Sequence, residues 1–294
     1  MDTEDRLERY SDADTWPAAQ SLAAMLDSQM AAFIAVKSAL PALACAAEAA
    51  ARRLEHGGRL VYAGAGASGR LAVQDGVELH PTFGWPRERL SYLIAGGEAA
   101  LVRSIEGAED DGAAAVAAVE ALVLGAADVV VAVAASGRTA FTCAAQRRAR
   151  AAGALTIGLA NNPDAPLLEE AEIPVLLATG PEFLAGSTRM TAGTAQKIAL
   201  NLLSTQIMMA LGRVYRGFMV DAVPSNAKLV ARAKGIVQAL TGRTAAEAEA
   251  LWARAGGDLK LAVLLADGLE LDQAKARLEA AGGNLRRARP EEGR

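Results

Sequence analysis

The pattern of apolar and polar positions changes its period near residue 58 of the chain. Before this point, residues 17–39 and 42–55 repeat apolar positions at helical spacing on either side of Pro41, and this predicts two helices. After it, short apolar runs alternate with alanine-rich stretches that suit helices. The runs are RLVYAG (59–64), LSYLIAG (90–96), DVVVAVAA (128–135), ALTIGLA (154–160) and IPVLLAT (173–179). The alternation predicts an α/β fold with a doubly wound, five-stranded parallel sheet covered by helices on both faces.

The segment 190–212 is apolar over most of its length, and Gln196, Lys197 and Asn201 interrupt it. Polar groups are costly inside a membrane span, so the pattern favours one long buried helix. We expect no transmembrane element and no membrane partner.

The composition changes again near residue 240, where the pattern predicts a small appendage of three short helices. Thr244 and Glu247 have the spacing of a capping box, and Asp258 and Asp272 stand at N-cap positions. The predicted domains are an N-terminal helical segment (1–57), a sheet domain that carries the function (58–235) and a small helical C-terminal domain (240–294).

Composition and charge limit the classes of molecule that the protein is expected to bind. The 294 residues carry a net charge of −4 and no basic stripe with interleaved aromatic residues, so nothing indicates nucleic acid, and a small molecule is expected. Cys45 and Cys143 form no metal or disulfide motif and are interpreted as core residues; neither a metal nor a cofactor is implied. The polar start MDTEDRLERY lacks the pattern of a signal peptide, and we expect a cytoplasmic protein.

The stretch GAGASG (64–69) matches the G-x-G-x-x-G pattern of dinucleotide-binding loops. Such a site also needs an acidic residue about twenty residues further on, at the end of the next strand, to bind the ribose. The nearest candidate, Glu98, lies about thirty residues beyond Gly69, and no Lys-Ser/Thr follows the glycines as in a P-loop. Tight binding of NAD(H) in a titration is the test that would restore the dinucleotide interpretation.

The four residues that end this loop occur a second time in the chain. Ala67-Ser68-Gly69-Arg70 follows the first predicted strand, and Ala135-Ser136-Gly137-Arg138 follows the third. Because the carboxyl ends of parallel strands lie at one edge of a sheet, both turns can offer backbone N–H groups and hydroxyls to one anion. Each serine taken alone is more often a helix N-cap. The candidate ligands of a phosphate or sugar here are Ala67, Ser68, Gly69, Ser136, Gly137, Arg138 and Thr139.

A third loop, GPEFLAGSTRMTAGTAQK (180–197), leads into the long apolar helix. Its Ser187, Thr188 and Arg189 extend the candidate anion site, with helix capping as the alternative. Arg70, Arg138 and Arg189 are each candidates to face a phosphate or to pair with the acidic cluster at 106–111, and we rank Arg189 first because of its loop.

Longer strings resemble one protein family. The chain contains, in order, GAGASGR (64–70), Glu78-x-x-Pro81-Thr82-Phe83-Gly84, IAGGE (94–98), EGAEDD (106–111), AASGRT (134–139), AGSTRMTAGTAQK (185–197), NLLST (201–205) and MVDAVPSNAKL (219–229). The paired Ser-Gly loops resemble the SIS (sugar isomerase) domain, and the longer strings resemble the N-acetylmuramic acid 6-phosphate etherases over roughly residues 58–230. The helical tail also looks like that of the family.

The resemblance implies cleavage of the D-lactyl ether at C3 of N-acetylmuramic acid 6-phosphate during recycling of cell-wall sugar. It assigns the two catalytic carboxylates to Glu78, as the acid that protonates the leaving oxygen, and Glu109, acting at C2. An acid must hold its proton near neutral pH, which burial among the apolar neighbours Val77, Leu79 and Phe83 favours. Likeness to the family also implies a homodimer, for which the apolar helices at 17–55 and 190–212 offer surface. His80 is interpreted as structural, because neighbours on a helix point apart.

The chain departs from the family pattern at three places. Its N-terminal helical region lacks the family's usual opening and its Asn-x-Glu-Asp segment. Ala67 stands where the family has threonine, and the element around Glu78 reads Val77-Glu78-Leu79-His80 instead of Ser-Glu-Cys-Pro. These departures leave the sugar and its ether or N-acyl group open. Two alternatives also stay open: an aldose–ketose isomerase acting on a sugar phosphate, and a non-enzymatic sugar-phosphate sensor that resembles the glucokinase regulatory proteins.

Overall fold

A computed structural model describes residues 2–224 and 226–289. The chain divides into two compact units, and each is described by itself. Unit 1 comprises Met1–Gly76 and Glu88–Gln206, and unit 2 comprises Val77–Arg87 and Ile207–Arg294. The N-terminal helical segment thus belongs to the same unit as the sheet. Unit 2 begins earlier than the predicted C-terminal domain and also includes residues 77–87.

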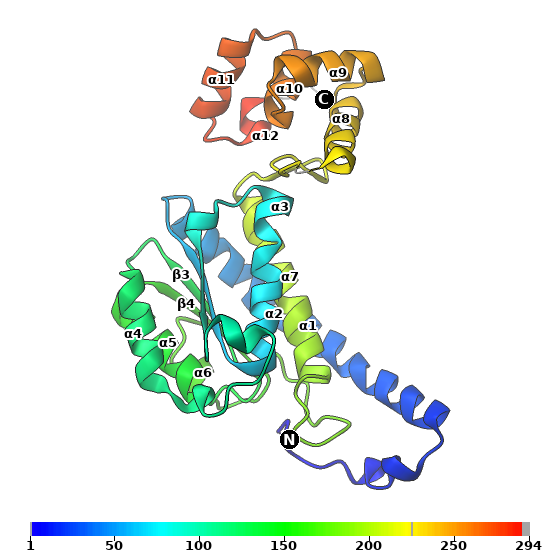
Figure 1. The fold of residues 1–294 in the computed structure, drawn as a ribbon, viewed down its shortest axis with the longest axis vertical. Helices are drawn as coiled ribbons and strands as arrows, with labels where there is room; N and C mark the ends of the chain where they lie inside the picture. The colour runs from blue at the N-terminus through cyan, green and yellow to red at the C-terminus, as the bar shows by residue number, and fades with distance from the viewer. Residues whose placement is uncertain (1, 225, 290–294) are drawn as a thin grey trace. The chain divides into compact units, whose positions relative to one another are not determined.

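Unit 1 is built on a five-stranded parallel sheet (Figure 1). Its strands are β1 (Leu60–Gly64), β2 (Leu90–Ile94), β3 (Val129–Val133), β4 (Leu155–Ala160) and β5 (Ile173–Leu176). Their order is β2-β1-β3-β4-β5, and every neighbouring pair is parallel. All five predicted strands are confirmed, because short apolar runs between helices are the pattern of strands buried on both faces.

Helices cover both faces of this sheet. On one face lie α4 (Gly112–Leu122), α5 (Ala140–Ala151) and α6 (Pro166–Glu169), and on the other lie α1 (Ala18–Leu54), α2 (Gly66–Val77) and the first part of α7 (Thr191–Ala210) (Figure 1). Short 3-10 turns complete the unit: η1 (Glu8–Tyr10), η2 (Ala13–Thr15), η3 (Arg87–Arg89), η4 (Glu98–Leu101) and η5 (Ala108–Asp110).

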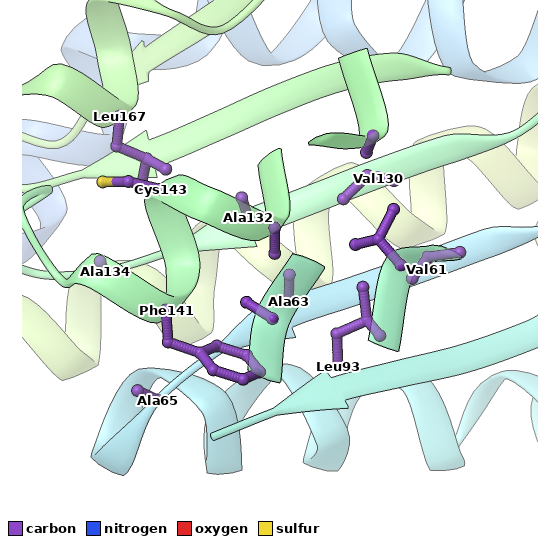
Figure 2. Close-up of a cluster of buried hydrophobic side chains, with 14 of the residues drawn as sticks. Val61, Ala63, Ala65, Leu93, Val130, Ala132, Ala134, Phe141, Cys143 and Leu167 are labelled. Atoms are coloured by element: carbon purple, nitrogen blue, oxygen red, sulfur yellow. The ribbon is translucent and has the colours of Figure 1, made fainter. Parts of the chain in front are cut away.

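Alternate residues of each strand build the core on each face. Val61 and Ala63 of β1 pack with Val130 and Ala132 of β3 and with Phe141 of α5 (Figure 2). Cys143 lies in this core, as expected, whereas Cys45 is exposed on α1, so the interpretation of Cys45 as a core residue is wrong.

The two helices predicted before residue 57 form one helix, α1, with Pro41 inside it. A proline removes one backbone hydrogen bond and usually ends or kinks a helix. Here Pro41 is exposed, and buried residues on both sides of it, such as Val36 and Leu43, belong to the face of α1 that packs on the sheet. Packing therefore outweighs the local signal.

The helix with the membrane-like apolar window is α1 rather than the 190–212 segment. Among the described residues, α1 alone is long and apolar enough to cross a membrane, and 39% of its most apolar window is buried. Core helices of soluble proteins pass the same test, so length and composition do not by themselves assign a span to α1. The predicted helix at 190–212 is confirmed as α7.

The described part of unit 2 consists of short helices and one hairpin. They are α3 (Leu79–Phe83), β6 (Val214–Tyr215), β7 (Phe218–Met219), α8 (Ala227–Thr241), α9 (Ala245–Arg254), α10 (Leu259–Ala266), α11 (Leu271–Ala280) and α12 (Leu285–Ala288). The capping box of Thr244 and Glu247 and the N-cap Asp258 are confirmed. Asp272 is not an N-cap, because Glu270 begins α11. The tail holds one short helix more than predicted, α12, which the buried Leu285 anchors.

Candidate functional site

The two ASGR loops leave neighbouring strands at the same edge of the sheet. Gly64, the last residue of β1, is in register with Val133, the last residue of β3. The strand order places β2 on one side of β1 and β3 on the other, so the chain reverses its direction of winding between β1 and β3. Ligands of open α/β sheets bind outside the carboxyl ends of strands at such a switch point. The pair of loops predicted from sequence therefore lies where the fold favours a ligand.

In the first loop, glycines let α2 start close to the end of β1. A Cβ added at Gly69 would lie 3.0 Å from the backbone carbon and oxygen of Gly64. Gly66 has a φ of 52°, which favours glycine because other residues are strained there. Ser68 stands in the first turn of α2 and is buried.

The second loop has the same letters but a different conformation. Gly137 has a φ of 64°, and a Cβ there would lie 2.5 Å from that of Ala165. Ser136 is half-buried, and its hydroxyl accepts a hydrogen bond from the Arg138 N–H at 3.2 Å. Thr139 is the N-cap of α5, yet its side chain makes no capping hydrogen bond, so its hydroxyl remains available to a ligand.

The Glu109 carboxylate lies over the first loop. Glu109 stands on η5, which packs against α5, the helix that follows the second loop. A Cβ added at Gly66 would lie 2.7 Å from Glu109 Oε1. This contact favours Glu109 over Glu106 of the same acidic cluster as the carboxylate of the site. From the sequence, that choice depended only on likeness to the family motif. A carboxylate beside the switch point can accept a proton from a bound ligand.

In the third loop, backbone donors at the start of α7 already bind a side chain of the protein. The fully buried Glu182 accepts hydrogen bonds from the N–H groups of Thr191 and Ala192, both at 2.9 Å. These two donors at the start of α7 are therefore occupied by a carboxylate of the protein. Ser187 and Thr188 are half-buried in the turn before α7, and Arg189 is exposed.

The three candidate arginines differ in their contacts. Arg70 donates to the carbonyl of Ala100 at 2.9 Å and of Arg103 at 3.2 Å, and so ties α2 to the segment after β2. Arg138 donates to the Asp164 carbonyl at 3.1 Å. Within residues 2–224 and 226–289, no hydrogen bond or ion pair is found for the Arg189 side chain. Arg70 therefore has a structural role, and Arg189 keeps its first rank.

Glu78 belongs to unit 2, where it precedes α3 as its N-cap. It is exposed and lines a pocket of about 250 Å³, whose other walls include Pro81, Met219 and Ile236. Leu79 is buried as expected, but its side chain does not bury the Glu78 carboxyl, and Val77 is 50% exposed. The apolar enclosure expected around Glu78 is thus absent; instead Glu78 lines a mainly apolar pocket whose lining also includes Arg232.

Buried charges of unit 2 hold the segment that carries Glu78. The Arg213 guanidinium donates to the carbonyls of Phe83 and Gly84 at 2.8 and 3.0 Å. Asp221 lies 4.0 Å from Arg213 and accepts a hydrogen bond from Lys260 Nζ at 2.6 Å. Burial raises the pKa of Asp221, against the opposing charges of Lys260 and Arg213. None of these three charges was predicted as functional, because their partners are backbone groups and residues distant in sequence.

His80 has the structural role expected of it. Its Nδ1 lies 3.0 Å from the Trp85 carbonyl oxygen, which closes the turn after α3.

A second buried carboxylate, Asp75, was also missed from sequence. It accepts hydrogen bonds from Tyr62 of β1 and Asn201 of α7, both at 2.6 Å, and from Ser204 at 3.0 Å. Burial and the Asp75 charge raise the pKa of Tyr62 well above its usual value and that of Tyr92 to about 12. This network joins α2, α7 and the sheet, and so fixes the helix that begins at the first loop.

Comparison with curated proteins finds close relatives over most of the chain. It is 54% identical over 278 residues to the N-acetylmuramic acid 6-phosphate etherase of Deinococcus radiodurans, a match that covers 94% of this chain and 91% of the relative. It is 47% identical over 255 residues to the protein of the same name from Serratia proteamaculans, which covers 86% of each chain.

Two further comparisons concern the sheet domain. Residues 42–150 match the family model of the glucokinase regulatory protein N-terminal SIS domain. Among solved structures, a phosphoheptose isomerase from Francisella tularensis is similar at a TM-score of 0.51 and 19% identity, covering 66% of this chain and 100% of the other. At that identity the likeness concerns the fold alone, and it agrees with the predicted sheet.

Proposed function

The chain is an enzyme of the N-acetylmuramic acid 6-phosphate etherase family, and we propose that it uses Glu109 as base and Glu78 as acid to cleave the D-lactyl ether of that sugar phosphate. The products are N-acetylglucosamine 6-phosphate and D-lactate. The observation that carries the assignment of the base is the contact of the Glu109 carboxylate with Gly66, at the switch point of the sheet.

The reaction needs two proton transfers. In the ring-opened sugar the C2 hydrogen lies next to an aldehyde, and Glu109 removes it as a proton. The electron pair forms the C2–C3 double bond while the C3–O bond breaks, and Glu78 protonates the departing D-lactate oxygen. Water then adds its hydroxyl at C3 and a proton returns to C2, so the overall change is hydrolysis. A positioned acid or base typically contributes about 10²–10⁴-fold to the rate.

The phosphate is assigned to the loops of unit 1. The donors are the hydroxyls of Ser68, Ser136 and Thr139 and the backbone at Ala67, with Arg138, Ser187, Thr188 and Arg189 as further contacts. The N–H groups of Gly69 and Gly137 were also expected to bind the phosphate, but they donate to the carbonyls of Ala65 at 2.9 Å and Ala134 at 3.1 Å, so these two glycines shape the loops instead. The start of α2 and the available Thr139 hydroxyl support this assignment. Glu182 occupies the start of α7, so the third loop is expected to contribute side chains rather than that helix terminus.

Release of D-lactate from N-acetylmuramic acid 6-phosphate tests the proposal. We expect turnover by the wild type and a loss of at least about 10²-fold in kcat for Glu78→Gln and for Glu109→Gln. Glu106→Gln is the matched control, because Glu106 is an exposed carboxylate of the same cluster and should leave kcat unchanged. A wild type that binds the sugar and releases no D-lactate contradicts the etherase proposal.

The match to the regulatory protein domain favours a second candidate, a sensor that binds sugar phosphates without turnover. Calorimetric binding of N-acetylmuramic acid 6-phosphate with no product after prolonged incubation would favour the sensor. Conversion of an aldose phosphate to its ketose would instead favour an isomerase.

We also propose that the protein is a cytoplasmic homodimer that pairs through α1. The first half of α1 projects away from the sheet (Figure 1) and exposes large apolar side chains: Leu22, Leu26, Met30, Phe33 and Ile34. A contiguous apolar surface of this kind marks an interaction site. Leu26→Glu with Phe33→Glu should give a monomer by light scattering at micromolar concentration. A wild type that is already monomeric refutes the dimer.

A further inference from the structure

Glu78 shares its pocket with one cation of unit 2. Among the lining residues that the structure describes, Glu78 and Arg232 of α8 are the only two that carry a charge. Pro81 and Thr82 follow Glu78 along the chain and line the same pocket. The apolar part of the wall comes from other elements of the unit and includes Met219, Leu229, Ala233, Ile236 and Leu259. The acid of the proposed reaction therefore stands with an arginine at an apolar wall.

Neither of these two charges has a partner among the described residues. No hydrogen bond or ion pair is found there for the Glu78 carboxylate or the Arg232 guanidinium, and both residues are exposed. Lys234, two residues further along α8, instead pairs with Glu249 at 2.5 Å. The N–H donors of an arginine form a planar fork that fits a carboxylate. The Arg232 fork is therefore available to an anionic group of a ligand in this pocket.

The leaving group of the proposed reaction matches the chemistry of this pocket. In a D-lactyl ether one chiral carbon carries the ether oxygen, a methyl group and a carboxylate, so the acid that protonates the oxygen lies beside the other two groups. Arginine binds carboxylate oxygens through two parallel N–H groups, and an apolar wall favours a methyl group. Whole small ligands fill pockets of about 300–1,000 Å³, so the volume of about 250 Å³ suits one substituent of a sugar phosphate.

We propose that this pocket is the subsite for the D-lactyl group, in which Arg232 binds the carboxylate, and Met219 and Ile236 contact the methyl group. The proposal rests on the proposed function, because the oxygen that Glu78 protonates sets the place of the lactyl group. Contacts to the oxygen, the carboxylate and the methyl group fix three substituents of one chiral carbon, so the pocket selects the D configuration. Arg232 is a specificity-determining residue: no bond of the carboxylate forms or breaks, and this group departs with D-lactate.

Two substrates that differ only in the charge of the leaving group test the proposal. They are N-acetylmuramic acid 6-phosphate and its lactamide, in which a neutral carboxamide replaces the carboxylate. Both give N-acetylglucosamine 6-phosphate, so formation of this common product by the full chain is measured for each. Loss of a charge-assisted arginine contact corresponds to a fall of about 10–100-fold, and we expect the kcat/KM of the wild type to be lower by that factor for the lactamide.

Arg232→Gln removes the charge and should lower kcat/KM for the acid by about 10–100-fold, chiefly through a higher KM, while turnover of the lactamide stays that of the wild type. General damage to the fold would lower turnover of both substrates, so the loss of preference is specific to the contact. Arg232→Lys keeps the charge without the fork and should retain part of the preference. Arg254→Gln is the matched control, because this exposed arginine of α9 belongs to the same unit and does not line the pocket. It should keep the preference of the wild type.

A wild type that turns over the lactamide as efficiently as the acid overturns the proposal, and so does an Arg232→Gln variant that keeps the preference for the acid. The first comparison needs no variant, so it does not depend on how Arg232→Gln folds. Failure of the proposed function is distinguished from both outcomes, because the wild type would then form N-acetylglucosamine 6-phosphate from neither substrate. That result would contradict the lactyl subsite as well.

Discussion

Strands β1 and β3 carry different chemistry at their two ends. At the amino ends, Arg59 and Asp128 form an ion pair at 2.8 Å, and each also bonds to backbone groups of the other strand or of the segment before β3. At the carboxyl ends stand the two ASGR loops, where glycines bring helix and strand close and the Thr139 hydroxyl makes no capping bond.

This difference indicates that the amino ends of the two strands serve stability and the carboxyl ends serve function. At the amino ends the charges of Arg59 and Asp128 are paired with each other and are not offered to a ligand. At the carboxyl ends the Thr139 hydroxyl makes no capping hydrogen bond, and the Glu109 carboxylate stands beside the first loop. Substitutions at the amino ends should change the free energy of unfolding alone, and substitutions at the carboxyl ends should also change catalysis.

The largest expected effect is that of Gly137→Ala. A Cβ would overlap those of Ala165 and Ala160, and the φ of 64° adds strain, so we expect a loss of about 2–5 kcal/mol in the free energy of unfolding. Urea titration measures it. Gly125→Ala is the control at the other end of β3, because a Cβ there meets no atom within 4 Å. Equal stability of the two variants would contradict the close packing of the second loop.

Asp128→Asn should cost about 2 kcal/mol, since the partly exposed Arg59 loses its charged partner but keeps solvent. The rate of D-lactate release per folded molecule should stay that of the wild type. A variant with unchanged stability and reduced rate would show that the amino ends are not purely structural.

Gly66→Ala should cost about 1–2 kcal/mol in stability through its φ of 52°. The new methyl group also displaces the Glu109 carboxylate, and a displacement of about 1 Å can lower the rate about 10²-fold. Gly242→Ala isolates the second effect, because Gly242 is a left-handed glycine with a φ of 68° and open space around it. Should both variants lose activity equally, the contact with Glu109 would be irrelevant to catalysis.

The pH dependence of stability should report the Arg59–Asp128 pair. Burial favours a raised pKa for Asp128, but hydrogen bonds from Arg59 and Gly125 and the charge of Arg59 hold this pKa below its ordinary value of 3.8. The unfolded chain then binds the proton more readily, so the stabilisation is present above pH 3.8 and is lost as the pH falls through the lowered pKa of the folded state. The stability difference between the wild type and Asp128→Asn should shrink over that range. A constant difference would contradict the shift.

The smallest effect on stability is expected for Thr139→Ala, within about 0.5 kcal/mol, because its side chain caps nothing. The KM for the sugar phosphate should nevertheless rise if the hydroxyl binds the phosphate. Thr244→Ala is a contrasting N-cap variant: Thr244 accepts a hydrogen bond from Glu247, and its loss should cost about 1 kcal/mol with KM unchanged. A Thr139→Ala enzyme with the KM of the wild type would remove Thr139 from the phosphate site.

The sequence by itself determined the strands, the long helix α7 and the caps at Thr244 and Asp258, since these depend on the period of apolar residues and on partners three residues apart. The repeated ASGR string also identified two loops that lie on neighbouring strands. The apolar period and the caps are local signals, and the repeated string is recognised because the same four residues follow two strands.

Only the tertiary structure decided which distant groups meet. Packing on both sides of Pro41 made α1 one helix, and folding brought Glu182 to the start of α7 and Glu109 to Gly66. It also assigned Glu78 to the unit formed by the C-terminal helices. The physical reason is that a buried carboxylate or a close backbone approach depends on groups tens of residues away, whose positions no local period encodes.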